Sequence, residues 1–235
     1  MKSRRHLAAS AVILELAQLC PALTLDTSSL LLSEAIADEG DAMTHPDTPP
    51  PPATTQTPAD AQSVVDFWNE AGEALWFGKD PAFDARFRAR FLTLHEAATR
   101  GELARWTSTA DGALALVILL DQFPRNAFRG TPRMYATDAM ARKIADAALK
   151  AGHGQAVEPA LRLFFYLPFG HSENLADQER SVALSEALGE PNLSHAKRHR
   201  DIIRRFGRFP HRNPILGRAM TPEEQRYLDE GGYAG

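Results

Sequence analysis

The sequence predicts an all-α fold, built as a single domain of antiparallel helix pairs joined by short turns. Helix start and stop signals recur from Asp60 onward, and no segment alternates apolar and polar residues as a half-buried strand does. The composition is that of a globular protein, because 44% of the 235 residues are hydrophobic and 24% are charged. This length is enough for one substantial core.

The second of the first two expected helices carries an aromatic stripe on one face. Asp60 can cap a helix that runs to about Phe77. Asp80 followed by Pro81 starts a second helix, since an aspartate cap and a first-turn proline are typical of helix starts, and Gly101 ends it. The helical spacing predicts a core-facing stripe of Phe83, Phe87, Phe91 and Leu94.

A buried element is expected next. Residues 114–120 are apolar on every side, which predicts a central helix enclosed by its neighbours. The polar stretch DQFPRNAFRG, residues 121–130, follows it, and we expect it to be a loop. The remaining expected helices are Thr137–Gly152, Glu158–Phe169, Ser172 or Glu173 to Leu188, Ser194–Phe206 and Thr221–Asp229, the last with a capping box of Thr221 and Glu224.

The domain is expected to cover residues 60–230. Residues 1–19 have a basic start and an apolar run, but Glu15 interrupts the run and no clear signal cleavage site follows. The run is also shorter than the ~20 residues that span a bilayer. We interpret residues 1–42 as an extension, either a start-site artefact preceding Met43 or a loosely attached amphipathic helix. Residues 43–59 are interpreted as a linker rich in proline and threonine.

Charge and cysteine content narrow the class of protein. The net charge is −4, which argues against a generally basic protein that coats nucleic acid, although residues 195–218 contain eight Lys or Arg and the single acid Asp201. No membrane partner is expected. Cys20 is the only cysteine, so no intrachain disulfide can form, and the cytoplasm is the default location.

The polar stretch after residue 120 is one half of a candidate site. Arg125 and Arg129 could each bind a carboxylate or phosphate, with Asp121 holding one of them in place. The alternative is a helix end whose polar groups bind only one another. The candidate ligand-binding residues here are Asp121, Gln122, Arg125, Asn126 and Arg129.

A short polar tripeptide supplies candidate catalytic groups. His171 could act as a general base, with Glu173 as its orienting partner or as a second acid or base. Ser172 is a weaker candidate nucleophile, because no Gly-x-Ser-x-Gly turn surrounds it. In the structural alternative, Ser172 only caps a helix and Glu173 complements its dipole.

The basic segment FGRFPHRNPILGR, residues 206–218, echoes the earlier FPRN stretch. Its candidate anion-binding residues are Arg208, Arg212, Asn213 and Arg218, to which His199 and His211 add pH-dependent donors, with His211 also a candidate for proton transfer. Alternatively, Arg200, Arg204 and Arg208 form a solvated helix face. Nucleic acid is disfavoured, since Phe206 and Phe209 are interpreted as buried anchors.

The candidate groups require no metal or other cofactor. His171, Glu173, His199 and His211 could converge on a divalent ion, but no compact ligand motif such as HExxH is present. The neighbouring arginines would also repel a cation. The sequence identifies neither a reaction nor an oligomeric state.

Four motifs in one order, LLDQFPRNAFRGTPR, LPFGHSENLADQERSV, HRDIIRRFGRFPHRNPILGR and TPEE, carry a family resemblance. From about Val64 to Leu228 the chain resembles the bacterial domain-of-unknown-function family 924. The resemblance implies a tetratricopeptide-like, superhelical all-α fold and supplies no activity. Gly170 and Asn174 depart from the family pattern, in which a bulky and an acidic residue are expected.

Three functions fit these observations. We favour a polar, Arg- and His-rich pocket that binds, and in one version transforms, a small anionic molecule. The alternative is a tetratricopeptide-like adaptor that binds a peptide or protein in a concave groove. The third is an internal salt-bridge network, which predicts that every arginine is paired and that no cavity remains.

Overall fold

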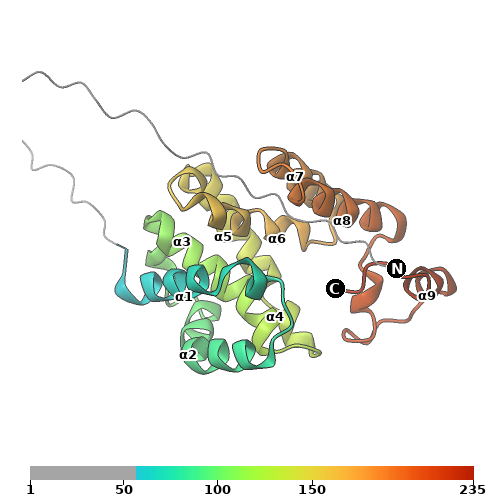
Figure 1. Cartoon of the computed structure of the whole chain (residues 1–235), viewed down its shortest axis with the longest axis horizontal. Coiled ribbons are helices and arrows are strands. Elements are labelled where there is room, and N and C mark those ends of the chain that lie inside the picture. The colour runs from blue at the N-terminus through green and yellow to red at the C-terminus, as the bar shows by residue number, and fades with distance from the viewer. Residues whose placement is uncertain (1–56) are drawn as a thin grey trace, which may run out of the picture. The chain divides into compact units, whose positions relative to one another are not determined.

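The computed structural model describes residues 57–235 (Figure 1). This region consists of helices and their connections and contains no strand, so the prediction of an all-α fold is confirmed. The finer expectation of a tetratricopeptide-like superhelix stays a prediction. The interpretations of residues 1–42 and of the linker up to residue 56 lie outside the described residues.

The first half of the domain packs around a central helix. Helix α3 contacts both α1 and α5, and α2 contacts α4. The bounds are α1 Ala59–Trp76, α2 Pro81–Thr99, α3 Ala110–Val117, α4 Phe123–Ala127 and α5 Asp138–Lys150.

The aromatic stripe of α2 forms the core as predicted. Phe83, Phe87 and Phe91 are buried, while Leu94 is partly buried against the same cluster. The ring centroids of Phe83, Phe87 and Phe91 lie 5.5, 5.3 and 5.2 Å from that of Phe67 in α1. Burial of such large rings supplies much of the stabilising energy of a domain of this size.

The central helix continues beyond the point where the sequence predicted a loop. Residues 110–117 are α-helical, Ile118–Gln122 form a π-helical turn, and α4 follows without a break. The expectation of a loop was wrong because the helix widens into a π-helical turn just before Pro124, and the Leu120 carbonyl, four residues before this proline, accepts from the Thr137 hydroxyl instead. The polar residues 121–126 are therefore carried on a buried, regular backbone.

The second half contains α6 Leu167–Gly170, α7 Leu175–Glu186, α8 Asn192–Phe206 and α9 Pro222–Asp229. Helices α7 and α8 form a hairpin with extensive contact, and α6 contacts both of them and α5 (Figure 1). A small second core of Ile202, Ile203 and Phe209 lies under the chain after α8. Among residues 57–235 no helix is long and apolar enough to cross a membrane.

Several expected helix starts differ in the structure. Residues 159–165 form a 3-10 helix instead of the first part of an α-helix. Helix α7 is capped by Asn174, so neither Ser172 nor Glu173 begins it. Thr137 precedes α5, but its hydroxyl donates to the Leu120 carbonyl and makes no cap. By contrast, the cap by Asp80 and the Thr221 capping box are confirmed.

Candidate functional site

A cavity of about 450 Å³ lies where the end of α1, α4, α6 and the α7–α8 hairpin converge. This volume falls in the range of small-molecule sites. Six of the candidate site residues line it, namely Gln122, Arg125, Asn126, Arg129, His171 and His199. The first half of the chain thus supplies one wall and the second half the opposite wall.

A buried polar contact beside this cavity joins His171 to Asp121. The ring nitrogen Nδ1 of His171 lies 2.8 Å from Asp121 Oδ1, and Asp121 is fully buried. The second carboxylate oxygen of Asp121 accepts a hydrogen bond of 2.6 Å from Gln122 Nε2. Asp121 is therefore the partner of His171, and the expectation that Glu173 orients this histidine was wrong.

The charge states of this pair follow from their surroundings. Burial by itself raises the pKa of Asp121, but Arg125 and the contacts with His171 and Gln122 lower it to about 2. Burial lowers the pKa of His171, and Arg125 lowers it further, against the opposing effect of Asp121. At neutral pH the pair is a carboxylate and a neutral imidazole, and the carboxylate holds the proton on Nδ1.

Arg125 is neutralised from two sides. Its guanidinium makes hydrogen bonds of 2.8 and 3.0 Å with the two oxygens of Asp138 and lies 3.3 Å from Asp121 Oδ1. Arg129 similarly binds Asp84 at 2.5 Å, and the amide of Asn126 donates to the same carboxylate. These arginines line the cavity as paired groups, not as free cations.

Arg212 reaches this network from the basic segment. Its guanidinium carbon lies 4.5 Å from the centre of the Tyr135 ring and 4.5 Å from that of Phe209, and its Nη2 donates to the His171 carbonyl. Asp138 is 3.6 Å away, and Nε is buried without a hydrogen-bond partner in the described region. Burial lowers the pKa of Arg212, with Arg125 adding to the effect.

A second, more open hollow of about 430 Å³ lies beside the first. His171 lines both, whereas Ser172, Glu173 and Arg212 line only the second. The Ser172 hydroxyl donates to Asp177 at 2.6 Å, which leaves it poorly placed to act as a nucleophile.

The remaining cations of the basic segment are paired. Arg218 binds both oxygens of Glu173 at 2.7 and 2.9 Å, and Arg208 binds both oxygens of Glu224 at 2.6 and 2.8 Å. Asn213 is fully buried and accepts a hydrogen bond from Arg218. None of Arg208, Asn213 and Arg218 lines either hollow; these three hold the chain around α9 in place.

Two histidines of the candidate set are held neutral. Burial lowers the pKa of His199 to about 3 and that of His211 to about 4. Both rings pack on Tyr233, at centroid distances of 4.7 and 5.1 Å. His199 lines the main cavity, but His211 lines neither hollow, so the structure does not bring His211 to His171.

Sequence reasoning missed two cations that line the main cavity, Lys79 and Arg198. Lys79 Nζ donates to a main-chain oxygen of Gly235, the last residue, and Arg198 lies 5.0 Å from the centre of the Tyr233 ring. Arg198 has no carboxylate partner within residues 57–235, and Glu73 is the one acidic side chain on the described lining. Lys79 gave no signal because it stands alone in a turn.

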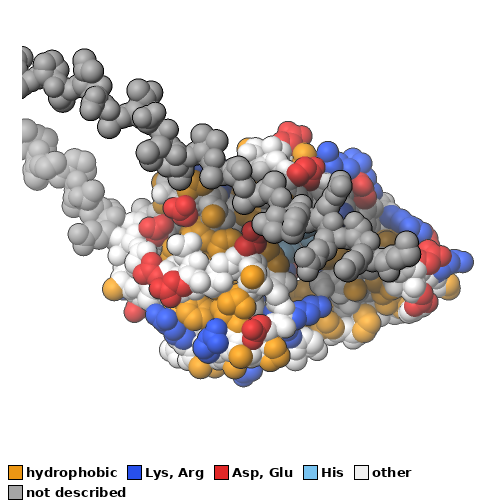
Figure 2. Space-filling view, in the orientation of Figure 1, with side chains coloured by type: hydrophobic (Ala, Val, Ile, Leu, Met, Phe, Trp, Pro, Cys, Tyr) orange, Lys and Arg blue, Asp and Glu red, His pale blue; other side chains and the backbone are white. Residues whose placement is uncertain are grey.

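Exposed Lys and Arg side chains elsewhere are interspersed with Asp and Glu on the face shown in Figure 2. Arg204 and Arg205, for example, bind Glu179 and Glu223. A mixed surface of this kind differs from the continuous basic surface expected for nucleic-acid binding.

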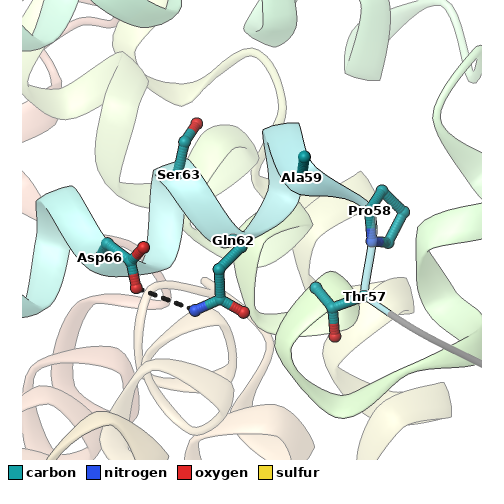
Figure 3. Close-up of a pocket in the computed structure, with 6 residues that line it drawn as sticks. All are labelled: Thr57, Pro58, Ala59, Gln62, Ser63 and Asp66. Carbon is teal, nitrogen blue, oxygen red and sulfur yellow. Dashed lines mark hydrogen bonds between the residues drawn. The ribbon is translucent and has the colours of Figure 1, made fainter.

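A third hollow, of about 690 Å³, lies at the first turn of α1 and is open to solvent (Figure 3). Its lining contains Thr57, Ser63 and Asp66, and the carboxylate of Asp66 accepts a hydrogen bond from Gln62. With one ionisable side chain, it lacks the groups that catalysis or anion binding needs. Within the described part of the chain, no cluster of three or more His, Cys, Asp or Glu could hold a metal ion.

Comparisons with known proteins place the chain in a family. A solved structure described as a protein of unknown function, ATU0120 from Agrobacterium tumefaciens, is 57% identical. The match covers 73% of this chain and 97% of that chain, with a TM-score of 0.72. No curated protein matches the sequence. The family model described as "Bacterial protein of unknown function (DUF924)" matches residues 64–232, and the chain therefore belongs to this family.

Proposed function

We propose that the protein binds a small anionic molecule in the main cavity and that His171 accepts a proton from it. The observation that carries the proposal is the charge of the lining. Arg198 has no carboxylate partner within residues 57–235, while Lys79 binds a main-chain oxygen of Gly235 and Arg125 and Arg129 are already paired. A bound anion would supply the missing negative charge.

The His171–Asp121 pair has the arrangement of an oriented general base. Because Nδ1 donates to Asp121, the lone pair of the neutral ring lies on Nε2. The lowered pKa of His171 keeps this nitrogen unprotonated at neutral pH. His171 lines the cavity, so Nε2 is the group available to take a proton from a bound molecule.

The cavity also distinguishes this proposal from its two alternatives. The internal-network hypothesis accounts for the pairing of Arg125, Arg208 and Arg218, but it predicts that no cavity remains. The adaptor hypothesis predicts a broad exposed groove, whereas Gln122, Asn126 and the other polar lining groups surround a volume suited to a small molecule.

The test is a thermal-shift screen of the full chain against mono-, di- and tricarboxylates and phosphate esters. A ligand at about 100 times its Kd stabilises the fold by roughly 2.7 kcal/mol. We expect Arg198→Gln and Lys79→Gln to weaken the shift, and the matched control Lys143→Gln, an exposed residue of α5, to leave it unchanged. If no anion shifts the wild type, or if the control weakens the shift equally, the proposal is wrong.

A further inference from the structure

The wall of the main cavity next to the cations is aromatic. It consists of Trp76 and Phe77 at the end of α1, together with Leu163, Tyr166 and Leu167. Phe77 is 56% exposed, although it stacks on Phe164 at a centroid distance of 6.4 Å and an interplanar angle of 15°. A ligand that covers this ring would remove apolar surface from water.

Arg198 is the lining cation that a bound carboxylate can pair with. It has no carboxylate partner within residues 57–235, whereas Lys79 lies 3.2 Å from the main-chain oxygen of Gly235, and Asp84, Asp121 and Asp138 pair with Arg129 and Arg125. A carboxylate can accept two parallel hydrogen bonds from the planar guanidinium of Arg198.

The aromatic wall and the cations border the same space in the cavity. Lys79 follows Phe77 by two residues, so a charge and an exposed ring lie on the same turn. Arg198 and His199 stand on the opposite wall, on α8, and His171 lines the space that these elements share. A molecule with a flat body against Phe77 and a carboxylate near the cations would fill it.

We infer that the ligand of this cavity is an aromatic monocarboxylate, with its ring against Phe77 and Trp76 and its carboxylate paired with Arg198. This inference rests on the proposed function and adds the chemical class of the ligand to it. The small-molecule volume of the cavity and its largely aromatic and aliphatic wall are the properties expected of such a site.

The experiment is calorimetric titration of the full chain with three probes, 3-phenylpropanoate, propanoate and the uncharged 3-phenylpropanamide. Burial of a phenyl group predicts that 3-phenylpropanoate binds about 30-fold more tightly than propanoate. We expect Phe77→Ala to weaken binding of the phenyl acid about tenfold and to leave propanoate unchanged. Leu175→Ala, which truncates another exposed apolar side chain away from the cavity, should change neither.

The outcomes of this titration distinguish the aromatic-acid inference from the proposed binding of an anion. Equal affinities for the two acids, or an effect of Leu175→Ala as large as that of Phe77→Ala, would overturn the inference and leave anion binding standing. Binding of the amide as tight as that of the phenyl acid would overturn the role of the cations, and with it the proposed function. Binding of no probe would overturn the aromatic-acid inference, while the thermal-shift screen would still judge anion binding. Since Phe77 is exposed, the variant is expected to fold, which circular dichroism checks.

Discussion

Replacing Asp121 by asparagine tests whether Asp121 is an ionised group that pairs with Arg125 and fixes the tautomer of His171. The substitution removes the charge that faces Arg125 at 3.3 Å and one of the two oxygens that accept from His171 and Gln122. Breaking a buried ion pair costs about 3 to 5 kcal/mol. Because Asp138 still pairs with Arg125, we expect Asp121→Asn to lower the free energy of unfolding by about 3 kcal/mol.

Urea denaturation monitored by circular dichroism measures this change, and the melting temperature should fall by roughly 6 to 12 °C. The matched control is Asp146→Asn, which removes a carboxylate from the exposed pairs with Lys150 and Arg180 and should cost less than about 1 kcal/mol. If Asp121→Asn costs no more than this control, Asp121 is not an ionised, paired group, and the assignment of the His171 tautomer is refuted.

Three further predictions concern pH, the cavity and the core. The folded pKa values of about 3 for His199 and about 4 for His211 lie below the ordinary 6.5, so stability is complete above pH 6.5 and is lost as the pH falls. From pH 7 to pH 5 each histidine should remove about 2 kcal/mol, measured by urea denaturation, and equal stability at both values would contradict their burial. Gly170→Ala would place a methyl group 3.0 Å from Ser181 Oγ inside the cavity, so titration should show weaker ligand binding with less than about 1 kcal/mol change in stability. Phe87→Ala should cost about 3 to 5 kcal/mol, and a loss below 1 kcal/mol in denaturation would show that the aromatic stripe is not core.

The sequence was sufficient to predict a helix cap where the capping residue and the amides it binds lie close together in the chain. Asp80 accepts from the amides of Ala82 and Phe83, and Thr221 exchanges hydrogen bonds with Glu224. Such caps depend on two or three neighbouring residues, so their spacing predicts them. The loop expected after residue 120 was wrong for the converse reason, because the group that replaces the missing amide of Pro124 is distant in sequence: the Thr137 hydroxyl donates to the Leu120 carbonyl.

For the site itself, the sequence predicted a set of candidate residues but not the partners that neutralise them. The partners of its arginines lie far away in sequence: Arg218 follows Glu173 by 45 positions, and Arg129 follows Asp84 by 45. Whether an arginine is free or neutralised is decided by such tertiary contacts, which no spacing rule describes. Lys79 was missed for the same reason, since only the tertiary fold places the turn after α1 and residues of α8 on one cavity lining.

The π-helical turn at Ile118–Gln122 makes the site sensitive to the length of the chain as well as to its residues. Here the Phe123 amide donates to the Ile118 carbonyl, five residues back, so the turn holds one residue more than an α-helix would. The Leu119 and Leu120 carbonyls of the turn are bonded outside the helix, to His95 Nδ1 and the Thr137 hydroxyl. Deletion of Ile118 would leave every site residue in the sequence, but it would remove the extra residue that this wider turn accommodates and draw these carbonyls back into the regular helical pattern.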